Sequence, residues 1–290
     1  MDARTFLGLE ETDRPTRWRL PVVPGLSTGG DFLFGGCGLA AACTVLEQVT
    51  GRTTVWATAQ FLSFARTHEV VDLDVDVSVS GHQITQARTV GRVGEREIFT
   101  VNAALGLREF PFDGEFAEMP DVPGPDRCQD REFRFPDRET ILNRLEQRVA
   151  VGRPMSDFKP KEQALREGAE QGSGRSALWI RLPSGLEMGA AALSIMGDYV
   201  PYGIREALGI MGGGNSLDNT IRIAHLVPSE WVLLDIRVHS IWGGFGHGLV
   251  HLWSQEGTLL ATASQSAIVR FWEGEGAAIR RQAERQQPAT

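Results

Sequence analysis

The sequence predicts an α+β fold in which each half of the chain wraps an antiparallel β-sheet around one central apolar helix. Three observations support this prediction: an internal repeat of strand-like segments, an uncharged helix candidate before each copy, and a length of 290 residues, enough for two cores. Placed side by side, two such halves would form one continuous sheet with two buried helices.

The internal repeat relates residues 71–108 to residues 232–270. The pattern VDLDVDV of the first copy falls on VLLDIRV of the second copy at a constant offset of 161 positions. From residue 71 to residue 80, apolar residues alternate with aspartate and serine, which is typical of a strand with one solvent-facing side. Polar turns at 94–96 and 255–257 occupy matching places. Each copy is therefore expected to form the same series of antiparallel strands.

One apolar helix is expected before each copy of the repeat. In the first half, FGGCGLAAACTVLEQVTG at 34–51 places its apolar residues on one stripe, and Gly51 is expected to end the helix. No charge occurs from residue 32 to residue 46, which indicates a helix enclosed by a sheet. In the second half, the helix is expected from Met188 to about Val200, with Pro201 as its stop.

The chain is expected to divide into four parts. Residues 1–115 form an N-terminal unit, and residues 116–170 form a linker rich in proline and charge, with a short capped helix from Asp137. Residues 171–275 form a C-terminal unit, and residues 276–290 form a polar tail that is expected to fray.

Composition excludes several functional classes. Hydrophobic residues make up 42% and charged residues 23%, as in an ordinary soluble globular protein. With a net charge of −8 and no basic run, nucleic acid is not an expected partner. We expect no membrane span and no targeting segment, hence a cytoplasmic location. Three cysteines without C-x-x-C spacing are too few for a disulfide framework, and the two in the apolar helix candidate, Cys37 and Cys43, are expected to be buried thiols.

Asp198 is the only charged residue between Met188 and Ile204. An ionised carboxylate moved out of water costs several kcal/mol unless hydrogen-bond donors meet it. Either this aspartate faces solvent, or the fold supplies partners and the site has a function.

Three other motifs are weaker indications of a function. GNSLD at 214–218 departs from the G-x-S-x-G nucleophile elbow at its fifth residue and lacks the strand–turn–helix context. His247 and His251 lie in a predicted strand without a third ligand, so no metal site is expected. The glycine-rich stretch 209–215 is either a flexible lip over a substrate tunnel or a plain linker, and these two interpretations stay open.

Five short pieces carry a resemblance to a known family. They are, in order, LFGGCGLAAA, MGDY, NSLDN, WVLLDI and ATASQSAIVR, and the resemblance as a whole covers the chain from about Trp18 to Phe271. In order and spacing the chain resembles the acyl-CoA thioesterase II family, which has two hotdog domains in one polypeptide. The resemblance implies a double-hotdog fold, hydrolysis of acyl-CoA to free fatty acid and CoA, no metal or other cofactor, and a homodimer.

The resemblance also implies the site residues. The family's Asp, Ser or Thr, and Gln fall on Asp198, Ser216 and Gln265, which would hold and activate a hydrolytic water. Their donors would also satisfy a buried carboxylate. Backbone N–H groups of Gly35 and Gly36, at the start of the first helix, are expected to bind substrate by stabilising the developing oxyanion.

Three segments depart from the family pattern and bear on substrate choice and on activity. FLSFART at 61–67 replaces a Phe-Leu-Arg-Pro-Gly-like segment, Asn219 replaces a His, and Ser266-Ala267 replaces a Glu-Gly pair. The alternative function is a non-catalytic acyl-CoA or acyl-carrier binding protein. A hotdog hydratase fits less well, because Val200 and Gly203 stand where the Asn and the catalytic His of that class would be.

Overall fold

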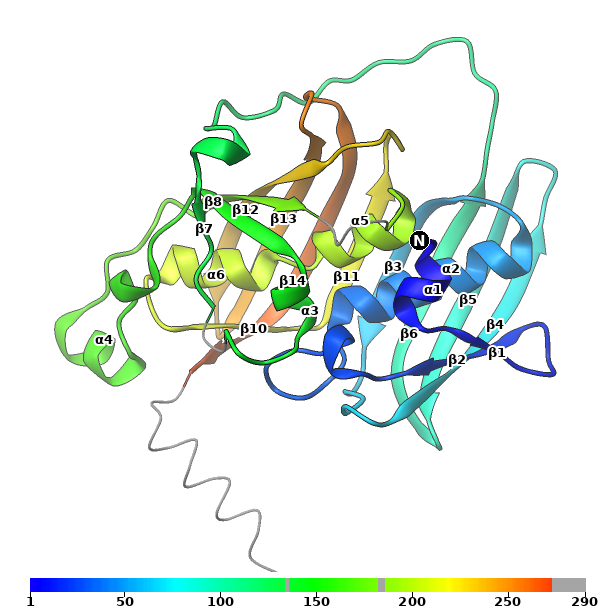
Figure 1. Cartoon of the computed structure of the whole chain (residues 1–290), viewed down its shortest axis with the longest axis horizontal. Helices are drawn as coiled ribbons and strands as arrows, with labels where there is room; N and C mark the ends of the chain where they lie inside the picture. Colours follow the sequence, from blue (N-terminus) through cyan, green and yellow to red (C-terminus); the bar gives the residue numbers. More distant parts are fainter. Residues whose placement is uncertain (134–135, 182–185, 273–290) are drawn as a thin grey trace, which may run out of the picture.

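A curved antiparallel sheet encloses the central helices of both halves in the computed structural model, which describes residues 1–133, 136–181 and 186–272 (Figure 1). The N-terminal half contains helices α1 (Ala3–Leu7) and α2 (Gly35–Thr50). Its strands are β1 (Glu10–Glu11), β2 (Arg17–Pro21), β3 (Thr54–Phe61), β4 (Val70–Ser80), β5 (Ile84–Val93) and β6 (Arg96–Gly106).

The C-terminal half has the larger number of elements. Its helices are α3 (Ile141–Arg144), α4 (Lys161–Glu167), α5 (Ala190–Gly197) and α6 (Val200–Leu208). Its strands are β7 (Gln129–Asp130), β8 (Glu146–Val151), β9 (Arg175–Arg181), β10 (Gly212–Ser216), β11 (Asp218–Ile223), β12 (Trp231–Trp242), β13 (Phe245–Ser254) and β14 (Leu259–Phe271).

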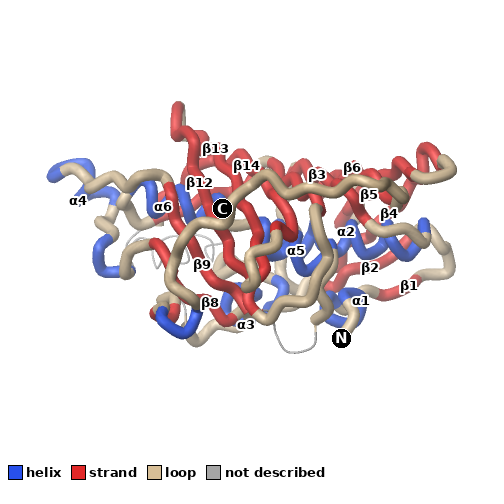
Figure 2. Tube along the Cα trace, turned by 90° about the horizontal axis from the view of Figure 1, so that it is seen from above, coloured by secondary structure: helices blue, strands red, loops and turns tan. Residues whose placement is uncertain are grey.

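All these strands belong to one 14-stranded sheet, so the predicted continuous sheet is confirmed. The order is β1-β2-β4-β5-β6-β3-β11-β14-β13-β12-β9-β8-β7, with β10 paired to β14. The halves meet where β3 pairs with β11, and a 2.6 Å hydrogen bond between the hydroxyls of Thr58 and Thr220 spans this joint. Seen from above, β13, β14, β3, β6, β5 and β4 lie along one side of the molecule, and the two ends of the sheet, with β9 and β8 at one end and β2 and β1 at the other, curl around the helices (Figure 2).

The predicted repeat is confirmed in detail. Strands β4, β5 and β6 form the same antiparallel meander as β12, β13 and β14. A bulge interrupts the first pair between Val77 and Val79 and the second pair between Val238 and Ser240, again at an offset of 161. The double-hotdog α+β fold follows from this duplication.

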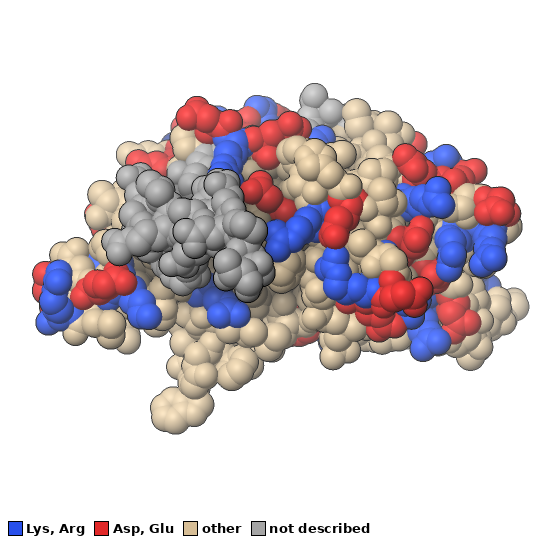
Figure 3. Space-filling view, turned by 90° about the horizontal axis from the view of Figure 1, so that it is seen from below, with Lys and Arg blue, Asp and Glu red and all other residues tan. Residues whose placement is uncertain are grey.

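The predicted first helix is confirmed as α2. Its residues from Gly36 to Leu46 are all buried, and Gly51 ends it in the left-handed conformation with φ 66°. Because the sheet surrounds the helix, its residues up to Leu46 are uncharged, and its one charged residue, Glu47, lies in the last turn, where its carboxylate accepts the N–H of Thr54 at 2.8 Å. On the outer side of β4, aspartates pair with arginines of the neighbouring strands, and basic and acidic side chains lie interspersed on the face shown in Figure 3.

The expected end of the second helix is wrong. The helix stops at Gly197, three residues earlier, and Pro201 lies in the first turn of a second helix, α6. Proline is tolerated there because first-turn N–H groups have no partner within the helix. The interruption leaves Asp198 between the two helices.

Part of the predicted linker lies inside the sheet. The expected short helix is α3, where the Thr140 hydroxyl caps the Asn143 N–H. However, β8 follows it directly and pairs with β9, so residues 146–151 extend the C-terminal sheet. The prolines and charged residues around this strand are typical of a linker, so the sequence does not predict it.

Neither interpretation of the glycine-rich stretch 209–215 is correct. Residues 212–216 form β10, which pairs with the end of β14. Glycine suits this strand, because a Cβ on Gly214 would lie 2.9 Å from the Cβ of Ala267. The predicted tail, 276–290, lies outside the described residues.

The two central helices approach closely at Gly36. A Cβ there would lie 2.9 Å from Ile195 Cα and 2.9 Å from Ser194 O, both backbone atoms of α5. We therefore expect Gly36→Ala to lower the free energy of unfolding by roughly 1–3 kcal/mol through overpacking. Chemical denaturation measures this loss. Gly124→Ala is the matched control, because nothing lies within 4 Å of its Cβ position; equal losses in the two variants would contradict the prediction.

Candidate active site

Asp198 sits at the break between α5 and α6, where it caps the end of α5. Its φ and ψ of −90° and 53° are not helical, so the chain turns here and its side chain leaves the path of the helix. The residue is only 6% exposed. Asp198 therefore does not face solvent, and its buried carboxylate requires hydrogen-bond donors.

Donors reach Asp198 from three separate elements. Ser216, the last residue of β10, donates its hydroxyl to Oδ1 at 3.2 Å. Gln265, in the middle of β14, donates Nε2 to the same oxygen in a short hydrogen bond. The backbone N–H of Gly36, in the first turn of α2, donates to Oδ2 at 2.6 Å. The structure thus brings the predicted Asp198, Ser216 and Gln265 together.

The register of the sheet explains why Ser216 and Gln265 meet. Ser216 pairs with Ala267 on β14, two residues beyond Gln265. Ala263 and Ala267 are buried on the inner face, and side chains two apart on a strand share a face, so Gln265 also points inward. Its Nε2 then donates to Ser216 Oγ as well, at 3.0 Å.

Every hydrogen-bonding group of the Gln265 side-chain amide already has a partner within the protein. Its Oε1 accepts the N–H of Val200 at 3.0 Å and so satisfies a first-turn donor of α6. Its two Nε2 hydrogens are used by Asp198 and Ser216. The family resemblance implies that Ser216 and Gln265 hold both the water and Asp198. In this arrangement Gln265 positions the carboxylate and has no hydrogen left for a water.

The two predicted glycines differ in their roles. The Gly36 N–H is bound to Asp198, so it is not free to stabilise an oxyanion as expected. Gly35 lies beside the carboxylate, since a Cβ on it would be 2.7 Å from Asp198 Oδ2 and 3.0 Å from the Phe61 ring. Any larger residue at position 35 would collide with the carboxylate.

Burial raises the pKa of Asp198 to about 6, against the hydrogen bonds from Gln265, Gly36 and Ser216, which lower it. A carboxyl group with such a pKa is ionised at neutral pH and still basic enough to accept a proton. Its Oδ2 has one protein donor and therefore a free lone pair for a water. The arrangement fits general-base catalysis.

Cys37 can be excluded as a nucleophile at this site. The residue lies in α2 close to Asp198, and burial raises the pKa of its thiol far above the usual range, with the nearby Asp198 charge raising it further. The thiol is therefore protonated at neutral pH. The prediction of a buried cysteine in α2 is confirmed.

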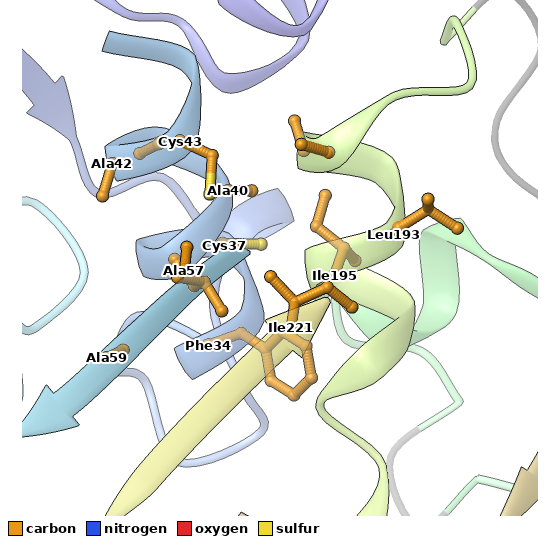
Figure 4. Close-up of a cluster of buried hydrophobic side chains, with 14 of the residues drawn as sticks. Phe34, Cys37, Ala40, Ala42, Cys43, Ala57, Ala59, Leu193, Ile195 and Ile221 are labelled. Carbon is orange, nitrogen blue, oxygen red and sulfur yellow. The ribbon is translucent and has the colours of Figure 1, made fainter. Parts of the chain in front are cut away.

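The sequence did not predict most of the aromatic and apolar side chains that surround the site. Phe61, from the departing FLSFART segment, packs against Gly35, and the rings of Phe34 and Tyr199 meet edge to face at 6.5 Å. Figure 4 shows Phe34, the N-cap of α2, and Cys37 of α2 facing Ile195 of α5 above the strand that carries Ile221. No sequence signal marks these contacts, because they depend on how closely the helices pack.

Comparisons with known proteins identify the family. Residues 125–269 match the family model of the acyl-CoA thioesterase C-terminal domain. A candidate thioesterase from Novosphingobium aromaticivorans of known structure is 34% identical in sequence, with a TM-score of 0.78 over 92% of this chain and 98% of that one. The chain belongs to the acyl-CoA thioesterase II family. Family membership supports thioester hydrolysis as the type of reaction.

Two more distant members share the fold. The acyl-CoA thioesterase II TesB2 of Mycobacterium marinum is 19% identical, with a TM-score of 0.69 over 94% of this chain and 99% of that one. The tesB protein of Mycobacterium avium subsp. paratuberculosis is 17% identical, with a TM-score of 0.73 over 92% and 97%. A search of curated proteins gave no match.

Within residues 1–133, 136–181 and 186–272, no three His, Cys, Asp or Glu side chains are arranged to hold a metal ion. None of the helices in these same ranges has the length and apolar character needed to cross a membrane.

We expect Ser216→Ala to raise the pKa of Asp198 above its value of about 6, because it removes a donor that stabilises the ionised form. The measurement is an NMR titration of the Asp198 side-chain carbon in both proteins. An unchanged or lower midpoint in the variant would show that the hydroxyl does not bind the carboxylate.

Proposed function

We propose that this protein hydrolyses acyl-CoA thioesters to free fatty acid and CoA, with Asp198 as the general base for a water molecule. The observation that carries the proposal is the buried carboxylate with a pKa of about 6, bound by donors from both halves of the chain. Membership of the acyl-CoA thioesterase II family supports acyl-CoA as the substrate.

In the proposed reaction, Asp198 accepts a proton from a water while the water oxygen attacks the thioester carbonyl carbon. The tetrahedral intermediate then collapses, the C–S bond breaks, and the thiolate leaves with its electron pair. Asp198 returns the proton to the departing sulfur. Because a thioester is electrophilic and a thiolate leaves readily, an oriented base is sufficient activation.

Ser216 and Gln265 act in this proposal by fixing the carboxylate. Both donate to Oδ1, which leaves Oδ2 as the oxygen that faces the water. Gln265 is itself fixed by the Val200 N–H, so the base is held by a connected set of hydrogen bonds. Preorganised groups of this kind need no rearrangement during the reaction.

Asp198→Asn is the direct test. The amide cannot accept a proton, so we expect thiol release from a panel of acyl-CoAs of varied chain length to fall by about 10²–10⁴-fold. For the wild type, kcat/KM is expected to rise with pH through about 6, because only ionised Asp198 can act as a base. Asp74→Asn, on the outer side of β4, is the matched control and is expected to keep full activity.

The alternative function is distinguished in the same assay. Tight acyl-CoA binding without thiol release above background in the wild type would favour a non-catalytic binding protein. Equal rates for wild type and Asp198→Asn would reject Asp198 as the base.

A further inference from the structure

Asn219, in β11, is a buried polar residue that the proposed reaction has not yet used. Its exposed fraction is 0%. Neither Nδ2 nor Oδ1 of its amide has a hydrogen-bond partner among the described residues. Buried amides in folded proteins are almost always hydrogen-bonded, so an exception calls for a functional explanation.

The strand register places Asn219 beside Gln265. β11 lies between β3 and β14, and Asn219 pairs with Ala59 on β3. On the other side Thr220 pairs with Ser264, so one step along the ladder sets Asn219 opposite Gln265. Opposed residues share a face of the sheet, with Cβ atoms about 4.5–5.5 Å apart. Because Gln265 points inward to Asp198, Asn219 points inward too.

The neighbouring contacts locate Asn219 within the site. In the adjacent inward row, Ile221 and Ala263 lie under the end of α5, since a Cβ on Gly197 would be 3.4 Å and 3.0 Å from their side chains. Two residues beyond Ala59 on β3, Phe61 packs against Gly35 next to the carboxylate. Asn219 thus lies between Phe61 of β3 and the end of α5 at Gly197. Figure 4 labels Ala59, the cross-strand partner of Asn219 on β3, and Ile221, two residues further along β11.

Two of the donors that bind Asp198 are fully engaged by the protein. The Gly36 N–H binds the carboxylate, and both hydrogens of Gln265 Nε2 are used within the network. The expected oxyanion donor at Gly36 is therefore occupied, whereas the Asn219 amide keeps its donors.

We propose that Asn219 Nδ2 donates a hydrogen bond to the thioester carbonyl oxygen, an inference that rests on the proposed hydrolysis. As the water oxygen bonds to the carbonyl carbon, the electron pair of the C=O bond moves onto this oxygen, and the amide stabilises its negative charge. The charge leaves again when the carbonyl re-forms and the C–S bond breaks. Asn219 is thereby a catalytic residue that contacts the reacting group.

The first test replaces the amide by an apolar side chain. Asn219→Val and Asn219→Ala are expected to lower kcat by about 10²–10³-fold, the loss typical of one oxyanion donor, with little change in KM. Their thermal midpoints are expected to equal or exceed that of the wild type, because an unpartnered buried amide is removed. Thr220→Val, the neighbouring residue on the opposite face of the same strand, is the control and is expected to keep its kcat.

The second test uses charge. Asn219→Asp places a carboxyl group beside Asp198, and like charges raise the pKa of a neighbouring carboxyl. We expect the acid limb of the kcat/KM profile to move to higher pH than in the wild type. A residue with a structural role away from the site would leave this limb in place.

The outcomes separate this inference from the proposed function. If the wild type releases thiol and Asp198→Asn does not, while Asn219→Val and Asn219→Ala keep kcat within twofold, only the inference about Asn219 is overturned. An unmoved acid limb in Asn219→Asp overturns it as well. If the wild type releases no thiol, the proposed function itself fails.

Discussion

The hydrogen bond from the Gly36 N–H to the Asp198 carboxylate joins the two halves of the molecule at a buried charge. A buried carboxylate is tolerated only where several donors meet it. This requires α2 and α5 to touch at a residue without a side chain, and it requires an unbroken sheet so that β10 and β14 deliver Ser216 and Gln265. The duplicated fold is thus the means by which one half supplies a carboxylate and the other a backbone donor.

The same arrangement has a cost in stability. The pKa of Asp198 is about 6 in the folded chain, against 3.8 for an unperturbed aspartate. Since the folded-state pKa is raised, folding is favoured when the group is protonated, and this advantage is lost as pH rises from about 4 through 6. At neutral pH the loss is about 3 kcal/mol. A site that stabilised the ionised carboxylate more strongly would lower the pKa of Asp198 and so make it a weaker base.

The repeat and the strand periodicity predicted one continuous antiparallel sheet around two central helices, because both patterns are visible along the chain, and the family resemblance implied the double-hotdog fold. The predictions from sequence were wrong where tertiary contacts, not the local residue pattern, determine the secondary structure. Pro201 is expected to end a helix but lies in the first turn of α6, and prolines around β8 led to the expectation of a linker there. For the site, Asp198, Ser216 and Gln265 could be chosen by resemblance, whereas the use of the Gly36 N–H by the carboxylate depends on how closely two helices pack, which no sequence pattern records.

The contact between the halves can be observed directly through the amide proton of Gly36. We expect its chemical shift to titrate with a midpoint at about pH 6, moving upfield as Asp198 is protonated and the hydrogen bond weakens. In Asp198→Asn this titration is expected to disappear. A wild-type Gly36 amide whose shift stays constant between pH 5 and 7, while the shifts of residues elsewhere in the site titrate, would contradict the account.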